Sequence, residues 1–441
     1  NISNDPNNCG KCERVCEVTA NVSSVGCINS VCSVDYCIGG YTDLDKKYEN
    51  GCEYKCRRVS DRELPSNMQD DDCDGFIDNI CSYEVDSRTY NIASDLSGRV
   101  SGIFSVSDDK YTCAAFIESL LNKTSIMKLS VIEGSQKVLF VTDMKELSGD
   151  CSFGSVAMKL LGDYIDVFWT ENCGDESRIM YNKISYNGIP VGETTELYKG
   201  TGPFTNLIVT RYKSAVYISF ETTENGKKSV IFAEVDTLKP EMVSKRVISN
   251  KELDSYGHNI IIEDDNIYVS YCEVKNDGIE VVVMKNELFG NSQLRYPVYK
   301  TDRNVTGTAI GFGNGYFILM WTESETSVGA MYITVLNQEM ISLILKKVNL
   351  NYDEFGLPVI SYNGNIFGSA FQGVRNGKGY ILFSDIDIGG NEISELIISP
   401  VSLIEKPYMS SDRSTFYVFY TDINSKMKYS LNMKRVYCRE N

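Results

Sequence analysis

A motif that recurs about every fifty residues dominates the chain after residue 90. In each copy a turn is followed by alternating apolar positions, then by an aromatic residue, and usually by a carboxylate two positions later. The aromatic residues are Phe116, Trp169, Phe220, Tyr271, Trp321, Phe371 and Tyr420. Because their spacing is nearly constant, the motif indicates a repeat architecture.

The pattern inside each copy is that of β-strands. Residues such as Ile165, Val167 and Trp169 alternate with the period of two that places side chains on one buried face. Hairpin turns such as Gly162-Asp163 precede this strand, and further turns and apolar runs complete each copy. Four antiparallel strands repeated radially form a blade, so the seven copies predict an all-β fold, a seven-bladed β-propeller with four-stranded blades.

The last copy has only three of the four strands and is expected to end near Met433. Upstream of the first copy, residues 85–93 have the pattern of a spare strand. We therefore expect this N-terminal strand to be the outer strand of blade seven, because a ring that did not close in this way would leave an open edge.

Ten of the fifteen cysteines lie within the first 81 residues. Such a density in a stretch with few apolar runs predicts a disulfide scaffold and an oxidising compartment. The Cys9-x-x-Cys12 spacing would also suit half of a zinc site. Zinc sites normally need a second close pair or histidine partners, and the single histidine, His258, is remote, so disulfides are favoured.

Two short motifs frame residues 1–56. The first is Asp5-Pro-Asn-Asn-Cys9-Gly-Lys-Cys12, and the second is Asn50-Gly-Cys52-Glu53. This segment resembles a cysteine-rich repeat of secreted and surface proteins of myxobacteria and related Gram-negative bacteria. The resemblance implies export and a stalk or spacer role. The repeat often has a cysteine where this chain has Leu44, so either Cys56 serves as the partner or one thiol is left over.

Residues 67–81 have the spacing of an EF-hand-like calcium loop, in which Gly75 permits the sharp turn. The ligands would be four carboxylates and one backbone carbonyl, namely Asp70, Asp72, Asp74, Asp78 and the carbonyl of Phe76. The segment is similar to the metal-binding motif that accompanies these cysteine-rich repeats, and to the calcium loops of dockerins and thrombospondin type 3 repeats. Cys81 replaces the usual glutamate at position 12. The alternative is a solvated acidic linker, but the register of the carboxylates favours one Ca²⁺.

The chain thus divides into a cysteine-rich disulfide module (1–56), a calcium-binding loop or linker (57–82) and the propeller (83–441). Its 43 basic and 60 acidic residues give a net charge of −17, which argues against nucleic acid or an anionic membrane as partner. No apolar run is long enough to span a bilayer. Without an initiator Met or a signal segment, we expect a processed chain or a fragment.

Five carboxylates follow the repeat aromatics and would lie around one face of the ring. They could form an acidic ring that holds cations or a basic or hydroxylated ligand, although acids at strand ends are more often simply solvated. These residues are Glu118, Glu171, Glu273, Glu323 and Asp422. Trp169 and Trp321 are expected in the core rather than as sugar-stacking platforms, and His258 alone is weak support for catalysis.

The repeat also predicts how some cysteines pair. The turn at Gly162-Asp163 places Cys151 opposite Cys173 on adjacent strands, where they should form a disulfide. Cys81 and Cys438 flank the gap at which blade seven closes, so a disulfide between them would replace a missing covalent loop. Cys113 and Cys272 lie in separate ladders and are expected to be buried free thiols.

These features favour a secreted or cell-surface binding or structural protein of a Gram-negative bacterium. Its partners would be an extracellular protein or glycan, or copies of itself in a filament, and its roles adhesion, ligand display or filament assembly. The alternative is an extracellular propeller glycosidase or lyase acting on polysaccharide. The chain lacks the S-x-D-x-G-x-x-W box of sialidases, so the binding role is favoured over the enzyme.

Overall fold

The computed structural model describes the chain except for residues 1, 29, 44–46, 58, 60–80, 135–136, 225, 326–327, 365, 387–394, 403–404, 413–414 and 441. It also leaves out the side chains of residues 81, 82, 224, 325, 328 and 438–440. The described part of the chain contains no helix that is long and apolar enough to cross a membrane.

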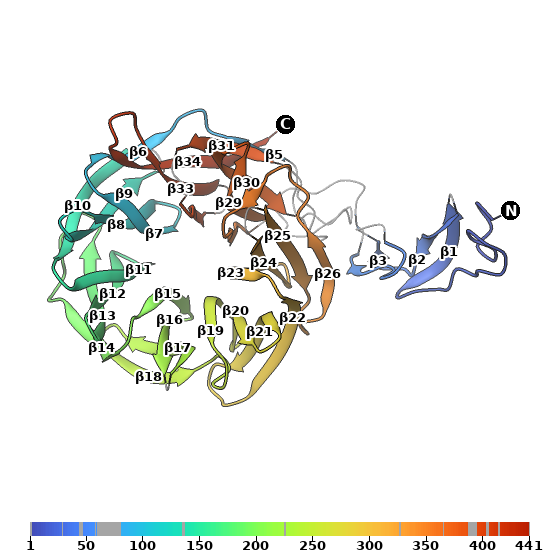
Figure 1. The fold of residues 1–441 in the computed structure, drawn as a ribbon, viewed down its shortest axis with the longest axis horizontal. Helices are drawn as coiled ribbons and strands as arrows, with labels where there is room; N and C mark the ends of the chain where they lie inside the picture. The colour runs from blue at the N-terminus through green and yellow to red at the C-terminus, as the bar shows by residue number, and fades with distance from the viewer. Residues whose placement is uncertain are drawn as a thin grey trace.

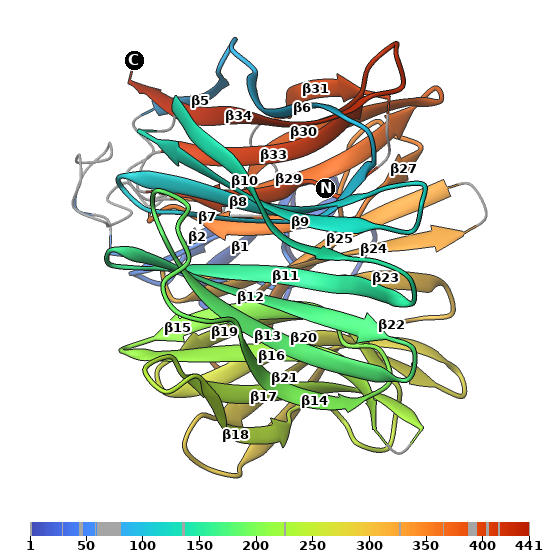
Figure 2. The ribbon, with the colours of Figure 1, turned by 90° about the vertical axis from the view of Figure 1, so that its left-hand side faces the viewer.

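Seven antiparallel sheets are arranged in a ring, so the predicted seven-bladed propeller is confirmed (Figure 1). Seen from the side, the blades stack against one another around the ring (Figure 2). Within a blade the chain runs from the centre of the ring outward.

The strands of every blade occupy four radial positions, which are inner, second, third and outer. In order from blade 1 to blade 7, the inner strands are β7 (Arg99–Ser107), β11 (Cys151–Leu161), β15 (Thr205–Tyr212), β19 (Ser255–Glu263), β23 (Asn304–Gly313), the pair β27 (Glu354–Phe355) and β28 (Val359–Tyr362), and β32 (Tyr408–Ser411). In the same order, the second strands are β8 (Tyr111–Ser119), β12 (Tyr164–Cys173), β16 (Ala215–Glu224), β20 (Asn266–Lys275), β24 (Tyr316–Glu325), β29 (Phe367–Arg375) and β33 (Thr415–Ile423). The third strands are β9 (Ser125–Glu133), β13 (Glu176–Ser185), β17 (Lys227–Asp236), β21 (Gly278–Glu287), β25 (Val328–Leu336), β30 (Lys378–Ile386) and β34 (Tyr429–Glu440). The outer strands of blades 1 to 6 are β10 (Lys137–Leu147), β14 (Thr195–Thr201), β18 (Glu241–Val247), β22 (Gln293–Thr301), β26 (Ser342–Lys347) and β31 (Leu396–Val401).

Blade 7 is closed by the N-terminal side of the domain, as predicted. Its outer edge consists of β5 (Cys81–Val85) and β6 (Tyr90–Leu96), which both pair with β34. Two predicted boundaries are wrong. The third strand continues past Met433 to Glu440, and the outer strand is interrupted after Val85, where the Asp86 carboxylate turns to accept a hydrogen bond of 2.6 Å from Arg435 Nη2.

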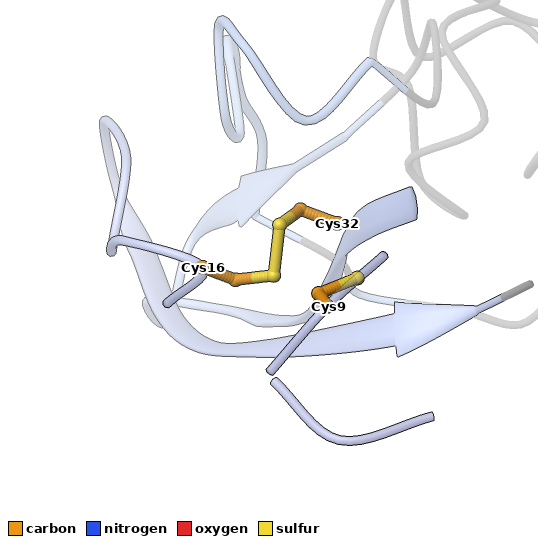
Figure 3. Close-up of side chains that lie close together, drawn as sticks. All are labelled: Cys9, Cys16 and Cys32. Atoms are coloured by element: carbon orange, nitrogen blue, oxygen red, sulfur yellow. A yellow bond between two sulfur atoms is a disulfide. The ribbon is translucent and has the colours of Figure 1, made fainter. Parts of the chain in front are cut away.

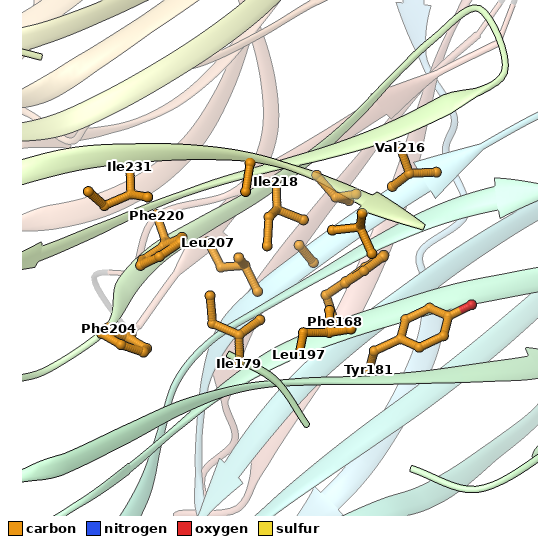
Figure 4. Packing of buried hydrophobic residues seen from close by; sticks show 14 residues of the cluster. Phe168, Ile179, Tyr181, Leu197, Phe204, Leu207, Val216, Ile218, Phe220 and Ile231 are labelled. Atoms are coloured by element: carbon orange, nitrogen blue, oxygen red, sulfur yellow. The ribbon is translucent and has the colours of Figure 1, made fainter. Parts of the chain in front are cut away.

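The core lies between blades, because each blade is packed between two neighbours. In blade 2, Trp169 packs toward blade 1 in the cluster that contains Ala115. The next side chain along the strand, Phe168, packs toward blade 3 against residues such as Phe220 (Figure 4). The second strands therefore bury both faces, where the alternation alone predicted one. All seven repeat aromatics are buried.

The inner strands of blades 1 to 5 each contain a β-bulge three or so residues after they begin. Such bulges bend a strand and shift its register by one residue. At Gly257 in blade 4, φ is +64° and an added Cβ would lie 2.5 Å from the Gly307 Cα of the blade 5 bulge. Glycine is therefore required where these two bulges meet.

The N-terminal module is a small disulfide-linked unit beside the ring (Figure 1). It contains the hairpin β1 (Val22–Ile28) and β2 (Val31–Cys37) and the short pair β3 (Tyr41–Thr42) and β4 (Tyr54–Lys55). Tyr54 contacts Tyr316 of blade 5, with 6.2 Å between the ring centroids.

Candidate functional site

The predicted calcium ligands lie outside the described residues, so the calcium site stays a prediction. They are Asp70, Asp72, Asp74, Phe76 and Asp78.

Disulfides hold the N-terminal module together. The pairs are Cys9–Cys27, Cys16–Cys32 and Cys37–Cys52, and Cys56 is also disulfide-bonded. The sulfur atoms of Cys9, Cys16 and Cys32 lie within 4.8 Å of one another, as the ligands of a metal would (Figure 3). A metal needs thiolates, and these sulfur atoms are oxidised, so the cluster is structural. Cys12 is an exposed free thiol.

In blade 2 a disulfide joins Cys151 to Cys173, with a Cα separation of 4.0 Å. The hairpin turn alone would place Cys151 opposite the residue after Cys173. The bulge between Phe153 and Val156 shifts the register by one residue and brings the two cysteines face to face. This Cα separation is shorter than the roughly 4.4–6.8 Å usual for disulfides, and it is close to the roughly 4.5 Å between directly opposed residues of a non-hydrogen-bonded antiparallel pair.

The closure cysteines lie on paired strands, but their side chains are outside the described residues. Along the ladder of β5 and β34, Cys438 is opposite Tyr83, and Cys81 is opposite Glu440. The sequence had suggested that Cys438 lies in a gap after the last strand. It lies within that strand instead. The disulfide between Cys81 and Cys438 stays a prediction.

Cys113 and Cys272 are buried free thiols in the second strands of blades 1 and 4. Burial, with a smaller contribution from the Asp108 carboxylate, raises the pKa of the Cys113 thiol. Burial, with a smaller contribution from Glu221, raises the pKa of Cys272 to about 12. Both thiols are therefore protonated at neutral pH and pack as small apolar groups.

The glutamates of the proposed acidic ring are buried, and the expectation that they are solvated is wrong for all four of them. They are Glu118, Glu171, Glu273 and Glu323. The fifth acid, Asp422, is only half-buried. Because the second strands are covered on both faces as far as these four glutamates, most of the carboxylates find partners inside the protein.

Most of these carboxylates bind groups of their own or an adjacent blade. Glu118 Oε1 accepts the Ser97 and Gly98 N–H groups at 2.9 and 3.0 Å. Asp422 accepts the Ser402 N–H at 3.0 Å. These two acids thus hold the loops that enter blades 1 and 7, and they do not form part of one shared ligand site.

In blades 2 and 4 the carboxylate binds the aromatic residue of its own ladder. Trp169 Nε1 donates to Glu171 Oε1 at 2.9 Å, and the Tyr271 hydroxyl donates to Glu273 Oε1 at 2.9 Å. Glu273 also forms an ion pair of 2.6 Å with Arg295.

His258 also belongs to a buried network. Its Nδ1 lies 2.9 Å from Glu221 Oε1, and its Nε2 lies 2.9 Å from Ser219 Oγ. Burial favours a raised pKa for Glu221, but the hydrogen bonds and charge of His258 hold the pKa of that carboxyl below its usual value. The distances resemble those of a Ser-His-acid relay, but His258 and Ser219 are buried. A nucleophile must reach its substrate, so we interpret this network as a link between blades 3 and 4.

A polar cavity of about 550 Å³ opens between blades 4 and 5. The turn between β20 and β21 and the link from β22 to β23 border it. In a four-stranded antiparallel blade these two connections lie at the same end, so the cavity is on one loop face of the ring. Its charged lining residues are Asp277, Asp302, Glu323, Lys300, Arg303 and Lys347.

Two tyrosines form the aromatic part of the lining. The ring centroids of Tyr299 and Tyr332 are 5.1 Å apart, and the Tyr332 ring stacks on the buried ring of Trp321. Burial is the main cause that raises the pKa of Tyr299, and the Tyr332 hydroxyl and the Glu323 carboxylate raise it further. The Tyr299 hydroxyl therefore remains a hydrogen-bond donor at neutral pH.

Sequence reasoning identified Glu323 but missed the rest of this cavity. The available signal was the link from residue 299 to 303, Tyr-Lys-Thr-Asp-Arg, in which charged and aromatic residues are concentrated. Tyr332 and Lys347 are far along the chain, and only folding brings them to Tyr299.

The comparisons with known proteins support the fold. No family model and no curated protein matches the sequence. The polysaccharide lyase Uly1 matches with a TM-score of 0.53 at 10% identity, over 80% of this chain and 93% of that one. A protein of unknown function from Dyadobacter fermentans matches with a TM-score of 0.47 at 9% identity, over 81% and 99%. A subtype N11 neuraminidase-like protein matches with a TM-score of 0.46 at 10% identity, over 82% and 95%. The likeness to Uly1 shows a shared propeller architecture and, at that identity, nothing beyond the fold.

Proposed function

We propose that this chain is an extracellular binding protein whose propeller holds a ligand on its loop face. The observation that carries the proposal is the cavity between blades 4 and 5. It is open to solvent and contains three acidic and three basic side chains beside two tyrosines. Ligand sites in proteins commonly combine a concave surface with a few convergent polar groups.

The disulfides support the extracellular part of the proposal. Four of them lie in the described residues, three within the first 52 residues, and such bonds persist in oxidising compartments. The N-terminal module and its predicted calcium loop would then serve as a spacer on the surface of a Gram-negative bacterium. Adhesion, ligand display and a place in an extracellular filament are the roles that this arrangement suits.

A polysaccharide lyase or glycosidase is the second candidate. The same cavity contains three carboxylates, Asp277, Asp302 and Glu323, close to Arg303, and both enzyme classes use carboxylates or basic groups beside the scissile bond. The two candidates differ in one observable: an enzyme would convert a bound polysaccharide and a binding protein would release it unchanged.

A binding screen tests the proposal. The full chain is offered to immobilised oligosaccharides and to extracellular proteins, with and without EDTA, and the bound saccharides are then checked for cleavage. We expect saturable binding without cleavage. Weaker binding in EDTA would support the predicted Ca²⁺ as a stiffening element. Cleavage would replace the binding proposal by the enzyme, and the failure of every class of partner to bind would refute it.

A further inference from the structure

Glu323 differs from the equivalent residues of other blades in its hydrogen bonds. In blades 2 and 4 the carboxylate is bound by the aromatic residue two positions before it. In blade 5 neither Trp321 Nε1 nor Glu323 Oε1 has a hydrogen-bond partner among the described residues, although both atoms are buried. Buried polar atoms are nearly always paired, and an unpaired one carries a desolvation cost.

Glu323 also has a long ion pair. The Glu323 side chain is 2% exposed, and its ion pair with Arg303 is long, 4.0 Å from Nη1 to Oε2. In blade 4, by contrast, Glu273 forms an ion pair of 2.6 Å with Arg295 of the outer strand. Glu323 also lines the cavity between blades 4 and 5. Because Oε1 is covered as the side chain stands, a donor group on a ligand would reach this unpaired oxygen once the Glu323 side chain turned toward the cavity.

The remaining lining limits the chemistry of such a ligand. The charges of the three acidic and three basic side chains in the lining sum to zero, so the cavity has no net charge that would select a strongly anionic or cationic molecule. The rings of Tyr299 and Tyr332 offer an apolar face, and their hydroxyls and the Glu323 carboxylate offer donors and acceptors. An apolar ring face bordered by hydroxyl groups is the surface that a neutral sugar presents.

We propose that the cavity between blades 4 and 5 binds a neutral, hydroxyl-bearing sugar residue, and that Glu323 accepts hydrogen bonds from its hydroxyl groups. The proposal rests on the binding function proposed above and specifies its ligand class. Arg303 positions the carboxylate from the rim of the cavity, and Tyr299 and Tyr332 face the sugar ring.

The test uses the full chain on an array of neutral hexose, N-acetylhexosamine and uronate-containing oligosaccharides. We expect binding to neutral members of the array. In Glu323→Gln the acceptor loses its charge, and affinity for the best neutral oligosaccharide should fall by about tenfold or more in titration calorimetry. Glu171→Gln changes the same residue of blade 2, away from the cavity, and should leave affinity unchanged.

A second variant keeps the test informative if Glu323→Gln folds poorly. Arg303 is 44% exposed, so Arg303→Ala should fold normally, and we expect it to weaken sugar binding as well. Neutral sugars bound equally by the wild type and both variants would overturn the assignment of the cavity, while leaving the binding function intact. A preference for uronates would overturn the ligand class. If only proteins bind in the broader screen, the sugar proposal fails and the binding proposal stands.

Discussion

Blades 2 and 5 share one backbone plan, but they end differently at the loop face. On the third strand, the residue opposite Trp169 is Met180, whereas the residue opposite Trp321 is Tyr332. Blade 5 therefore has a hydroxyl-bearing ring where blade 2 has an apolar side chain. The polar ring lines the cavity and the apolar chain packs within a core cluster.

The start of the inner strand shows the same contrast. Two residues before the bulge, blade 2 has Cys151, which is bonded to Cys173, and blade 5 has Arg303, which lines the cavity. At these positions blade 2 is stabilised by a disulfide and apolar contacts, whereas blade 5 has polar groups that line a solvent-open cavity. The same positions thus stabilise the fold in one repeat and line the proposed ligand cavity in another.

The largest expected effect on stability comes from removing the disulfide of blade 2. The Cys151→Ser/Cys173→Ser double variant loses a disulfide that spans 22 residues. In the chain-entropy model, a loop of this length contributes about 3 kcal/mol to the free energy of unfolding, which urea denaturation would measure. The matched change in blade 5, Arg303→Ser, should cost less than about 0.5 kcal/mol, as is usual for exposed sites. Equal losses would show that Arg303 secures its blade as the disulfide does.

A smaller effect distinguishes the two tryptophans. Trp169→Phe and Trp321→Phe each remove part of a buried ring, but only Trp169 donates to a carboxylate. Trp169→Phe should therefore lower the free energy of unfolding by about 1–3 kcal/mol more than Trp321→Phe, because it leaves Glu171 buried without its donor. Denaturation of the two variants under the same conditions measures the difference. Losses of the same size would mean that Trp321 has an equivalent partner, and the argument for an unused acceptor at Glu323 would fail.

The propeller could be predicted from the sequence because its signal is local. Alternating apolar residues, turn residues and the repeat period specify each hairpin. The missing strand in the last copy indicated closure by residues 85–93, and the structure closes blade 7 with β5 and β6. The buried thiols Cys113 and Cys272 followed from the same alternation. The break at Asp86 could not be predicted, since it depends on Arg435, which is far along the chain.

The candidate site could not be predicted for a related reason. The tripeptides Trp169-Thr-Glu171 and Trp321-Thr-Glu323 are identical in sequence, yet one carboxylate is hydrogen-bonded and the other has an unused oxygen. The donor to Glu171 is Trp169 of the same tripeptide, so the two carboxylates differ because of residues on other strands, such as Met180 opposite Trp169 and Tyr332 opposite Trp321. The burial of these glutamates also depends on covering from both sides, which a single strand pattern does not contain.

The smallest expected difference concerns a buried acid that blade 2 has and blade 5 lacks. Asp166 and Ile318 each lie three residues before the ladder tryptophan. Burial raises the pKa of Asp166, although the Tyr181 hydroxyl, which donates to it at 2.7 Å, and the charges of Lys183 and Arg211 partly oppose the shift. A carboxyl whose pKa is higher in the folded than in the unfolded protein binds its proton more tightly in the folded state. Its contribution to stability is therefore greatest at low pH, and it decreases as the pH rises through the folded pKa.

The direction of this pH dependence can be measured as the difference in stability between the wild type and a variant, because the contributions of the other titrating groups cancel in that difference. As the pH rises above about 4, the usual range of an aspartate carboxyl, the stability of the wild type should fall relative to that of Asp166→Asn, with urea midpoints as the readout. Ile318→Val in blade 5 changes a core side chain without a titrating group, and its cost of about 0.5–1.5 kcal/mol should not depend on pH. If the wild type instead gained stability over Asp166→Asn as the pH rose, then Tyr181, Lys183 and Arg211 would stabilise the charged carboxylate more than burial penalises it. Asp166 would then secure blade 2 as an ion in the way that Glu273 does in blade 4, and the contrast with the apolar Ile318 of blade 5 would become sharper.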